Sequence, residues 1–262
     1  MGSEMCIRDR ESVATFLTLD RSNPNSIVSS VRSARENARS VRESLTLEMW
    51  ERLNYLHILV RSQDTPQQVP LGDVIRLCQS FSGITDATMS HGEGWHFGRL
   101  GRMIERADKT SRVLSVRFLM FLPEGPATAR PYDDILWAAL LKSISALEMY
   151  RKAHGLIVPE RVVDFLLLDP EFPRSVRHCM VEAEEALRAI SGTPSRRFLN
   201  RAEQLLGRLS AELDYLSVGE IVERGVDNFI ASLQADLNEV NDAVAETFFT
   251  LPPVQSFQRT EQ

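Results

Sequence analysis

The chain has 262 residues, of which 43% are hydrophobic and 25% are charged, and its formal net charge is −6. This length is enough to bury a sizeable core, and the composition excludes a chain that is disordered throughout. The acidic balance argues against non-specific binding of nucleic acid, and since the sequence holds no apolar run of about 18 residues, we expect no membrane span.

Helical patterns follow one another along nearly the whole chain. Between Ile27 and Leu45, apolar residues recur at spacings of three and four, which predicts a helix with one buried face. Thr46 is expected to cap the next helix, over 47–60. The same patterns predict further helices over 71–89, 95–121, 133–153, 160–168, 174–190, 195–216 and 219–248. No segment alternates convincingly at period two, so the expected fold class is all-α.

Two segments 149 residues apart share an unusual pattern, Phe-Leu-x-Leu-Asp followed by a proline and a serine. It occurs over Phe16–Ser26 and again over Phe165–Ser175, and nine of the 24 positions from 16 to 39 are identical to their counterparts. Thr46 and Ser195, both expected N-caps, have the same separation. We interpret the pattern as an internal duplication that produced a helical bundle of two related halves.

The two halves differ at their start. Two long predicted helices precede the second copy of the pattern, whereas only about a dozen residues precede the first, so the first half is expected to lack roughly 60 residues. The opening ten residues show no helical pattern and are interpreted as a non-native leader; the alternative is a genuine short form. The predicted organisation of one globular α domain is a leader at 1–10, a truncated first half-repeat at 11–92, a second half-repeat at 93–250 and a flexible tail at 251–262. Apolar surface left uncovered in the first half would favour a homo-oligomer.

The predicted helix over 95–121 is the most highly charged. At 100° per residue its buried stripe is expected to consist of Leu100, Ile104, Ala107, Ser111, Leu114 and Phe118. One flank of the stripe carries Gly101, Glu105, Asp108 and Arg112, and the other carries Arg99 and Arg106. Because glycine is unfavourable inside a helix, Gly98 and Gly101 suggest that something packs closely there.

The charged residues form a candidate polar cluster, although no catalytic residue can be assigned. Its members are Arg99, Arg102, Glu105, Arg106, Asp108, Arg112, Arg35, Asn37 and Arg39. One hypothesis is a site between the halves that binds an amine or a phosphate. The other, which we weight more heavily, is a structural network of ion pairs along and between helices.

No metal or cofactor is expected. The spacing His91-x-Glu93-x-x-His96 is not a recognised zinc pattern, and no glycine-rich phosphate loop or nucleophile motif occurs. Cys6, Cys78 and Cys179 show no paired spacing, which fits a reducing, cytoplasmic location. We expect Cys78 and Cys179 to be small core residues.

The run Gly-Arg-x-x-Glu-Arg-Ala-Asp-x-x-x-Arg over 101–112, preceded by Trp95 and Phe97, resembles the signature of the bacterial alpha-E family. Segments at 23–27, 34–43, 50–54 and 172–176 resemble that family too, and together the likeness covers nearly all of 11–250. Family members usually open with a first copy of the charged helix, which this chain lacks.

The resemblance implies no established activity. Members tend to be encoded beside, or fused to, ATP-grasp-type ligase-like proteins and transglutaminase-like proteins, which implies these as partners in making or modifying a peptide. The favoured function is therefore a non-catalytic, accessory component that acts with an ATP-grasp-type ligase. The alternative is an enzyme whose site lies between the halves, with Glu105 as acid or base and arginines holding a small anionic or peptide substrate.

Overall fold

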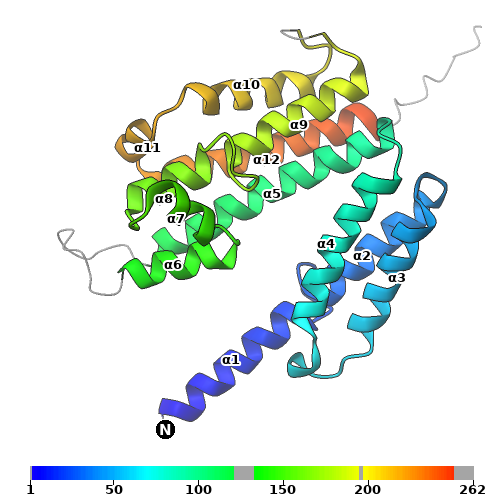
Figure 1. The fold of residues 1–262 in the computed structure, drawn as a ribbon, viewed down its shortest axis with the longest axis vertical. Helices are drawn as coiled ribbons and strands as arrows, with labels where there is room; N and C mark the ends of the chain where they lie inside the picture. Colours follow the sequence, from blue (N-terminus) through cyan, green and yellow to red (C-terminus); the bar gives the residue numbers. More distant parts are fainter. Residues whose placement is uncertain (1, 121–132, 195–196, 251–262) are drawn as a thin grey trace, which may run out of the picture. The chain divides into compact units, whose positions relative to one another are not determined.

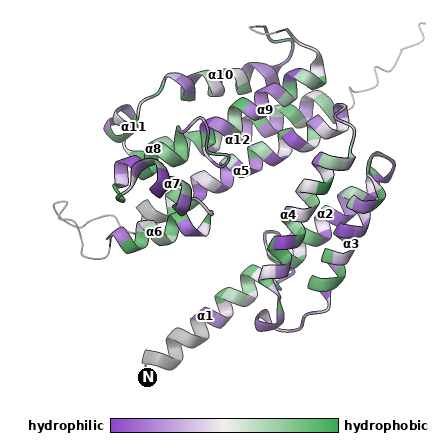
Figure 2. Ribbon diagram, in the orientation of Figure 1, coloured by the Kyte–Doolittle hydropathy of each residue, from purple (hydrophilic) through white to green (hydrophobic). Residues whose placement is uncertain are grey.

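The computed structural model describes residues 2–120, 133–194 and 197–250, without the side chains of 2–9, 117–120 and 133. Within these ranges the chain forms twelve α-helices and two short 3-10 helices and no β-strand, which confirms the all-α prediction (Figure 1). Most of the helices carry both hydrophilic and hydrophobic residues, as amphipathic helices do (Figure 2). The chain divides into two compact units, Met1–Trp95 and His96–Gln262, which we describe separately.

Unit 1 is built around three helices. Its elements are α1 (Gly2–Thr18), α2 (Ile27–Ser40), η1 (Arg42–Ser44), α3 (Leu47–Arg61), η2 (Pro66–Gln68) and α4 (Leu71–Thr88). Helix α3 packs against both α2 and α4, and α1 contacts α2 and η2. The core is small and consists of Val31, Leu56, Val60, Val69, Val74 and Leu77.

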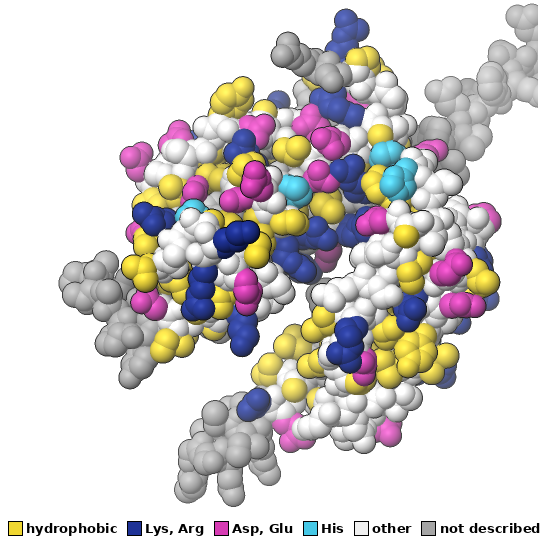
Figure 3. Space-filling model, viewed as in Figure 1, with side chains coloured by type: hydrophobic (Ala, Val, Ile, Leu, Met, Phe, Trp, Pro, Cys, Tyr) yellow, Lys and Arg dark blue, Asp and Glu magenta, His cyan; other side chains and the backbone are white. Residues whose placement is uncertain are grey.

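Large apolar side chains also reach the surface of unit 1. Val41, Tyr55, Ile58 and Ile75 are each 45% exposed or more, and hydrophobic side chains are visible on this unit in Figure 3. The predicted buried face over 27–45 is therefore only partly right. Val31 and Ala38 are buried, but Ala34 and Val41 are exposed, because no described helix of unit 1 covers their side of α2.

Unit 2 has a much larger core. Its elements are α5 (Glu93–Met120, which begins just before the unit boundary), α6 (Asp133–Ser143), α7 (Leu147–His154), α8 (Pro159–Leu167), α9 (Val176–Ser191), α10 (Arg201–Tyr215), α11 (Val218–Arg224) and α12 (Val226–Phe248). Helix α10 packs against α9 and α12, and α8 contacts α9 and α11. Helices α5, α9 and α12 run side by side (Figure 1), and all three contribute to one apolar core.

The structure confirms the buried stripe of α5 as far as its side chains are described. Leu100, Ala107, Ser111 and Leu114 are at most 1% exposed, and Ile104 is 7% exposed. Phe118 lies outside the described side chains. The stripe is also wider than predicted, since Met103 and Thr110 are buried beside it.

Two predicted helices are interrupted. The helix predicted over 133–153 is divided into α6 and α7 at Ser145, which has a positive φ of 56°. The helix predicted over 219–248 is divided into α11 and α12 at Gly225, whose φ of 83° suits a residue without a Cβ. Apolar periodicity continues across both breaks, so it does not reveal them.

Two predicted helix starts are also wrong. The opening ten residues were expected to lack helical structure, yet α1 begins at Gly2. The helix predicted to begin at residue 195 begins at Arg201 instead, and its N-cap is Asn200, whose side chain accepts from the N–H of Glu203. Ser195 itself lies outside the described residues.

The shared sequence pattern has the same local structure in both units. Helix α1 ends at Thr18 and α8 ends at Leu167, 149 residues later. In the turn that follows α1, Asp20 Oδ1 accepts from the N–H of Ser22 at 2.8 Å. In the turn that follows α8, Asp169 Oδ1 accepts from the N–H of Glu171, also at 2.8 Å. The next helix, α2 or α9, then begins at residue 27 or 176, again 149 residues apart.

The order and packing of the elements also correspond. The series α1, α2, α3, η2 and α4 in unit 1 matches α8, α9, α10, α11 and α12 in unit 2. Helices α3 and α10 both have 15 residues, and each packs against the second and the last helix of its series, α2 and α4 in unit 1 and α9 and α12 in unit 2. The contact of α1 with η2 likewise matches the contact of α8 with α11.

Candidate functional site

One flank of α5 faces α9. Arg99 forms ion pairs with Glu182 and with Glu185 of α9, the latter at 3.3 Å. Its side chain is 20% exposed, and that of Glu182 is 27% exposed, so this contact is partly shielded from water. A charge-assisted pair of this kind fixes the register between two helices.

Further along the same flank, α5 binds the loop that leads into α9. The Arg106 guanidinium donates to the carbonyl oxygen of Pro173 at 3.1 Å, and the Thr110 hydroxyl donates to that of Arg174 at 2.9 Å. Burial lowers the pKa of Arg106 from its ordinary value. Both residues therefore hold backbone carbonyl groups of the loop that precedes α9.

The opposite flank of α5 is an exposed network within one helix. Lys109 lies 3.1 Å from the Glu105 carboxylate and 3.7 Å from that of Asp108. Arg112 donates to Asp108 Oδ2 at 2.7 Å, and this bond raises the arginine's pKa. The Glu105 side chain is 66% exposed, whereas that of Asp108 is only 14% exposed.

Asp108 is the least satisfied member of this network. Its Oδ1 atom is buried, and the described residues offer it no hydrogen-bond donor. Arg102, six residues earlier along the helix, is also partly buried. The structure therefore brings together Glu105, Asp108 and Arg112, and it places Arg99 and Arg106 on a different side of the helix.

The two glycines of α5 do not mark a close approach. Gly98 and Gly101 are exposed, and a Cβ added at either position would meet no described atom within 4 Å. The expectation of tight packing at these glycines is therefore wrong for the part of the chain that the structure describes.

The remaining candidates lie in unit 1, on α2. Arg35 donates through Nε to Asn54 Oδ1 of α3 at 2.8 Å, and its guanidinium lies 5.8 Å from the Trp50 ring centroid. Arg42 approaches the same ring at 5.3 Å. Asn37 and Arg39 are exposed. The predicted cluster is thus divided between the two units.

The sequence analysis missed a buried carboxylate. Glu203, at the start of α10, is 3% exposed and accepts from the Thr193 hydroxyl at 2.7 Å and from the N–H of Leu199 at 2.7 Å, and also from the Ser191 hydroxyl. Burial opposes its ionisation, but these hydrogen bonds outweigh that effect and lower its pKa. The spacing Asn200-x-x-Glu203, which is that of a helix N-terminus with an acidic third residue, was the available signal.

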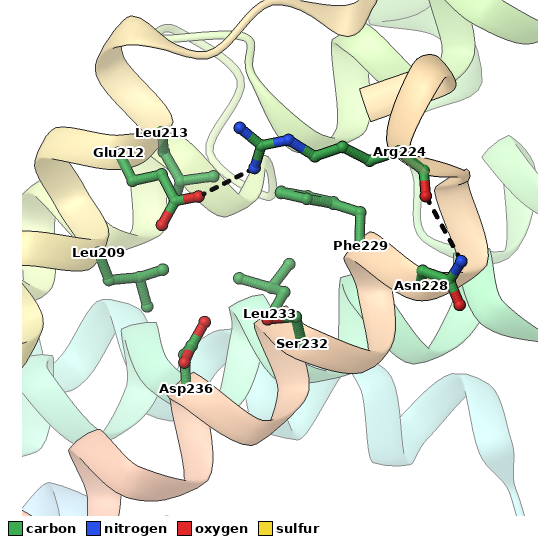
Figure 4. A pocket seen from close by; sticks show the side chains of 9 residues that line it. All are labelled: Leu209, Glu212, Leu213, Arg224, Asn228, Phe229, Ser232, Leu233 and Asp236. Carbon is green, nitrogen blue, oxygen red and sulfur yellow. Dashed lines mark hydrogen bonds and ion pairs between the residues drawn. The ribbon is translucent and has the colours of Figure 1, made fainter. Parts of the chain in front are cut away.

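Unit 2 also has small pockets. One of about 180 Å³ lies between α10, α11 and α12, and the ion pair of Arg224 with Glu212, at 3.4 Å, lies along it (Figure 4). Burial, together with repulsion from Glu212 and Glu239, raises the pKa of Asp236 in this pocket. A second pocket, of about 390 Å³, is lined by Phe165, Phe172 and other residues around the Asp169 turn. Neither pocket contains a residue of the predicted cluster.

Other site classes find no support in the described ranges. No group of three or more histidine, cysteine or acidic side chains there could hold a metal ion. His91 stacks on the Trp95 ring at 4.1 Å between centroids. No helix in these ranges is long and apolar enough to cross a membrane. Cys179 is fully buried, as expected, but Cys78 is exposed, so its assignment to the core is wrong.

Helix α5 holds a Glu-Arg pair, Glu105–Arg106, whose arginine anchors the loop before α9. A sequence model of the Alpha-E family, described as a predicted alpha-helical domain with a conserved ER motif, matches residues 3–249. The chain belongs to the Alpha-E family. The match begins within the first ten residues, which were interpreted as a leader.

Relatives of the chain include longer mycobacterial proteins. An uncharacterized protein of Mycobacterium bovis and one of Mycobacterium tuberculosis are each 26% identical over 253 residues. The alignment covers 90% of this chain but 28% of either relative. This Alpha-E chain therefore spans less than a third of the length of the curated relatives it matches. No solved structure matches it.

Proposed function

We propose that this Alpha-E chain is a non-catalytic, accessory component of a peptide-synthesising or peptide-modifying system in the cytoplasm. Its partner would be an ATP-grasp-type ligase-like protein, with a transglutaminase-like protein as a second component. Both partners come from the resemblance of the sequence to its family, and the function of this chain would be to bind them through helix faces.

One observation carries the non-catalytic part of this proposal. The arginines of the buried flank of α5 are engaged in holding α9 and its preceding loop, through Glu182 and the carbonyl oxygen of Pro173. An arginine committed to internal contacts cannot also clamp a substrate. The Glu-Arg pair of α5 would then serve the architecture, with Glu105 at the surface and Arg106 partly buried.

The alternative, an enzyme with Glu105 as acid or base, gains less support. A catalytic carboxyl group is normally placed where desolvation shifts its pKa toward the working pH. Glu105 is 66% exposed and paired with Lys109 at 3.1 Å, which is an ordinary surface arrangement.

We also propose that the two units descend from one duplicated ancestor. The agreement of helix ends, aspartate turns and packing order at a separation of 149 residues supports this origin. Within the duplication, α5, α6 and α7 are the helices of unit 2 that have no described counterpart in unit 1.

The proposed function is tested by ADP release from the neighbouring ATP-grasp-type protein, measured alone and with this chain added. Stimulation by wild type and equally by Glu105→Gln is the expected result for an accessory component. If Glu105→Gln instead lowers the stimulated rate of ADP release by roughly 100-fold, the result would support the enzyme hypothesis. If the chain neither binds the ligase nor changes its rate, the proposed partnership is wrong.

A further inference from the structure

The pocket of about 180 Å³ between α10, α11 and α12 lies entirely within unit 2 (Figure 4). All of its lining residues belong to this unit, so no residue of unit 1 is needed to form it. Four of the lining side chains are apolar and at most 8% exposed, namely Leu209, Leu213, Phe229 and Leu233. An apolar cavity of about 150 Å³ is enough to hold one benzene molecule. The pocket therefore has room for one small apolar group.

The break between α11 and α12 forms one end of this pocket. Gly225, at the break, has a φ of 83°, and Arg224 before it lines the same pocket as Asn228 and Phe229 after it. Arg224 pairs with Glu212 of α10 at 3.4 Å, and Asn228 donates to the Arg224 carbonyl oxygen at 3.4 Å. Because Glu212 already compensates the charge of Arg224, this arginine does not make the pocket a site for anions.

Asp236 is a carboxylate on the apolar face of α12. Phe229 and Ala243, seven residues before and after it, are both buried, and seven residues make nearly two turns of an α-helix. Asp236 therefore stands at a position of the buried stripe, and it is itself half-buried. Its carboxylate points into the space between Leu209 and Leu233 (Figure 4). Among the described residues, none donates a hydrogen bond to this carboxylate or forms an ion pair with it.

The surroundings of Asp236 disfavour its charge. Burial, together with repulsion from Glu212 and Glu239, raises its pKa. The nearby cations do not offset this effect. Arg224 pairs with Glu212 instead, and Arg208 lines an adjoining pocket with Asp236 but lies in no ion pair with it. An ionised carboxylate at this position therefore costs stability, and a cation bound beside it would remove that cost.

We propose that this pocket binds a primary ammonium group carried on a small apolar body, with the ammonium at Asp236 and the apolar part against Phe229 and Leu233. An organic cation fits better than a metal ion, since no three acidic, histidine or cysteine side chains of the described residues could hold a metal. An ammonium has three donors, and the Asp236 carboxylate accepts without donating. A free amine and the lysine side chain of a peptide present this same chemistry. The site goes beyond the accessory function and does not require a ligase.

The test titrates the full, isotope-labelled chain with benzylamine at pH 7 and follows the backbone amide shifts by NMR. The expected result is saturable shifts in α10, α11 and α12. Asp236→Asn should raise the Kd at least about 10-fold, because it removes the charge that pairs with the ammonium. Asp242→Asn, at an exposed position on the opposite side of α12, changes the net charge by the same amount and should leave the Kd unchanged. Benzyl alcohol, which has a similar shape and no charge, should bind at least about 10-fold more weakly than benzylamine.

Equal Kd values for wild type and Asp236→Asn, or for benzylamine and benzyl alcohol, would overturn the proposal. Without a ligand, Asp236→Asn should be at least as stable as wild type in chemical denaturation at pH 7, because it removes a repelled charge. A lower stability would give Asp236 a structural role and would also overturn the proposal.

The two sources of the ammonium are distinguished by a second probe, Nα-acetyl-lysine methylamide. Tighter binding of this probe than of benzylamine would support the lysine side chain of a peptide, and weaker binding would support a free amine. No arm of the experiment uses the ligase or ADP release, so this inference and the proposed function can fail separately.

Discussion

Ser26 and Ser175 perform the same task 149 residues apart. Each hydroxyl accepts from the backbone N–H three residues later, at 3.2 Å in α2 and 3.1 Å in α9, and each side chain is fully buried. The two caps are not equal, however. The Ser175 hydroxyl also donates to the carbonyl oxygen of Asp169, which ties the cap to the preceding turn.

The caps predict a difference in stability between the two positions. Ser26→Ala should lower the free energy of unfolding of unit 1 by about 1 kcal/mol, the usual cost of a lost N-cap. Ser175→Ala should cost more in unit 2, about 2 kcal/mol, because the Asp169 carbonyl loses its donor as well. Hydrogen exchange resolved to α2 and α9 would measure the two effects separately. A larger loss of protection in α2 than in α9 would contradict the assignment.

The loop before α9 gives a second prediction. Thr110→Val keeps the shape of a side chain that is 2% exposed but removes its hydrogen bond to the Arg174 carbonyl group. We expect unit 2 to lose about 1–2 kcal/mol in chemical denaturation. Arg112→Gln is the control on the exposed flank, and it should cost no more than about 0.5 kcal/mol. Equal costs for the two variants would mean that the α5 contact to this loop contributes nothing.

The sequence was sufficient to predict features that depend only on residues close together along the chain. Thr46 does accept from the N–H of Met49, at 3.3 Å, and the stripe of α5 is buried as its 100° spacing indicates. A side-chain cap and a helix face depend on residues within a few positions of each other. For that reason they can be predicted from one sequence.

The sequence was not sufficient to predict burial and ion pairs that depend on residues far away along the chain. Ala34 and Ala183 stand at the same position of the shared pattern, yet Ala34 is exposed, whereas Ala183 is fully buried in the apolar core to which α5 contributes. Arg99 and Arg112 are both arginines of one helix, and only the tertiary fold gives the first a carboxylate from α9. The candidate cluster could therefore be predicted as charged, but not divided into buried anchors and surface pairs.

The buried Glu203 predicts a dependence of stability on pH. Its folded pKa lies below the ordinary value of 4.5, so the unfolded chain binds more protons at acid pH. The stability from this group is fully present above pH 4.5 and is lost as pH falls through the folded pKa. Glu203→Gln should destabilise unit 2 by about 1–3 kcal/mol at pH 7, and the difference from wild type should shrink below pH 4.5. The control Glu223→Gln, at an exposed position, should show the same dependence of stability on pH as wild type. Parallel curves for wild type and Glu203→Gln down to pH 3 would show that the carboxylate is not stabilised by its hydrogen bonds.

The cysteines predict a selective labelling reaction. Cys179 is fully buried, and burial raises the pKa of its thiol to about 11. Partial burial of the thiol also raises the pKa of Cys78, but that residue is exposed and open to a reagent. The thiolate is the reactive form, so Cys179 should react only when unit 2 opens. In a Cys6→Ser background at pH 8, an aromatic disulfide reagent should modify Cys78 at least about 100-fold faster than Cys179. Denaturant should remove this difference in labelling rate. Thr110→Val should reduce it, because the variant loosens the loop before α9, and the Pro173 carbonyl oxygen of that loop lies 3.7 Å from the Cys179 sulfur. Equal rates in the native chain would mean that the core of unit 2 does not shield Cys179.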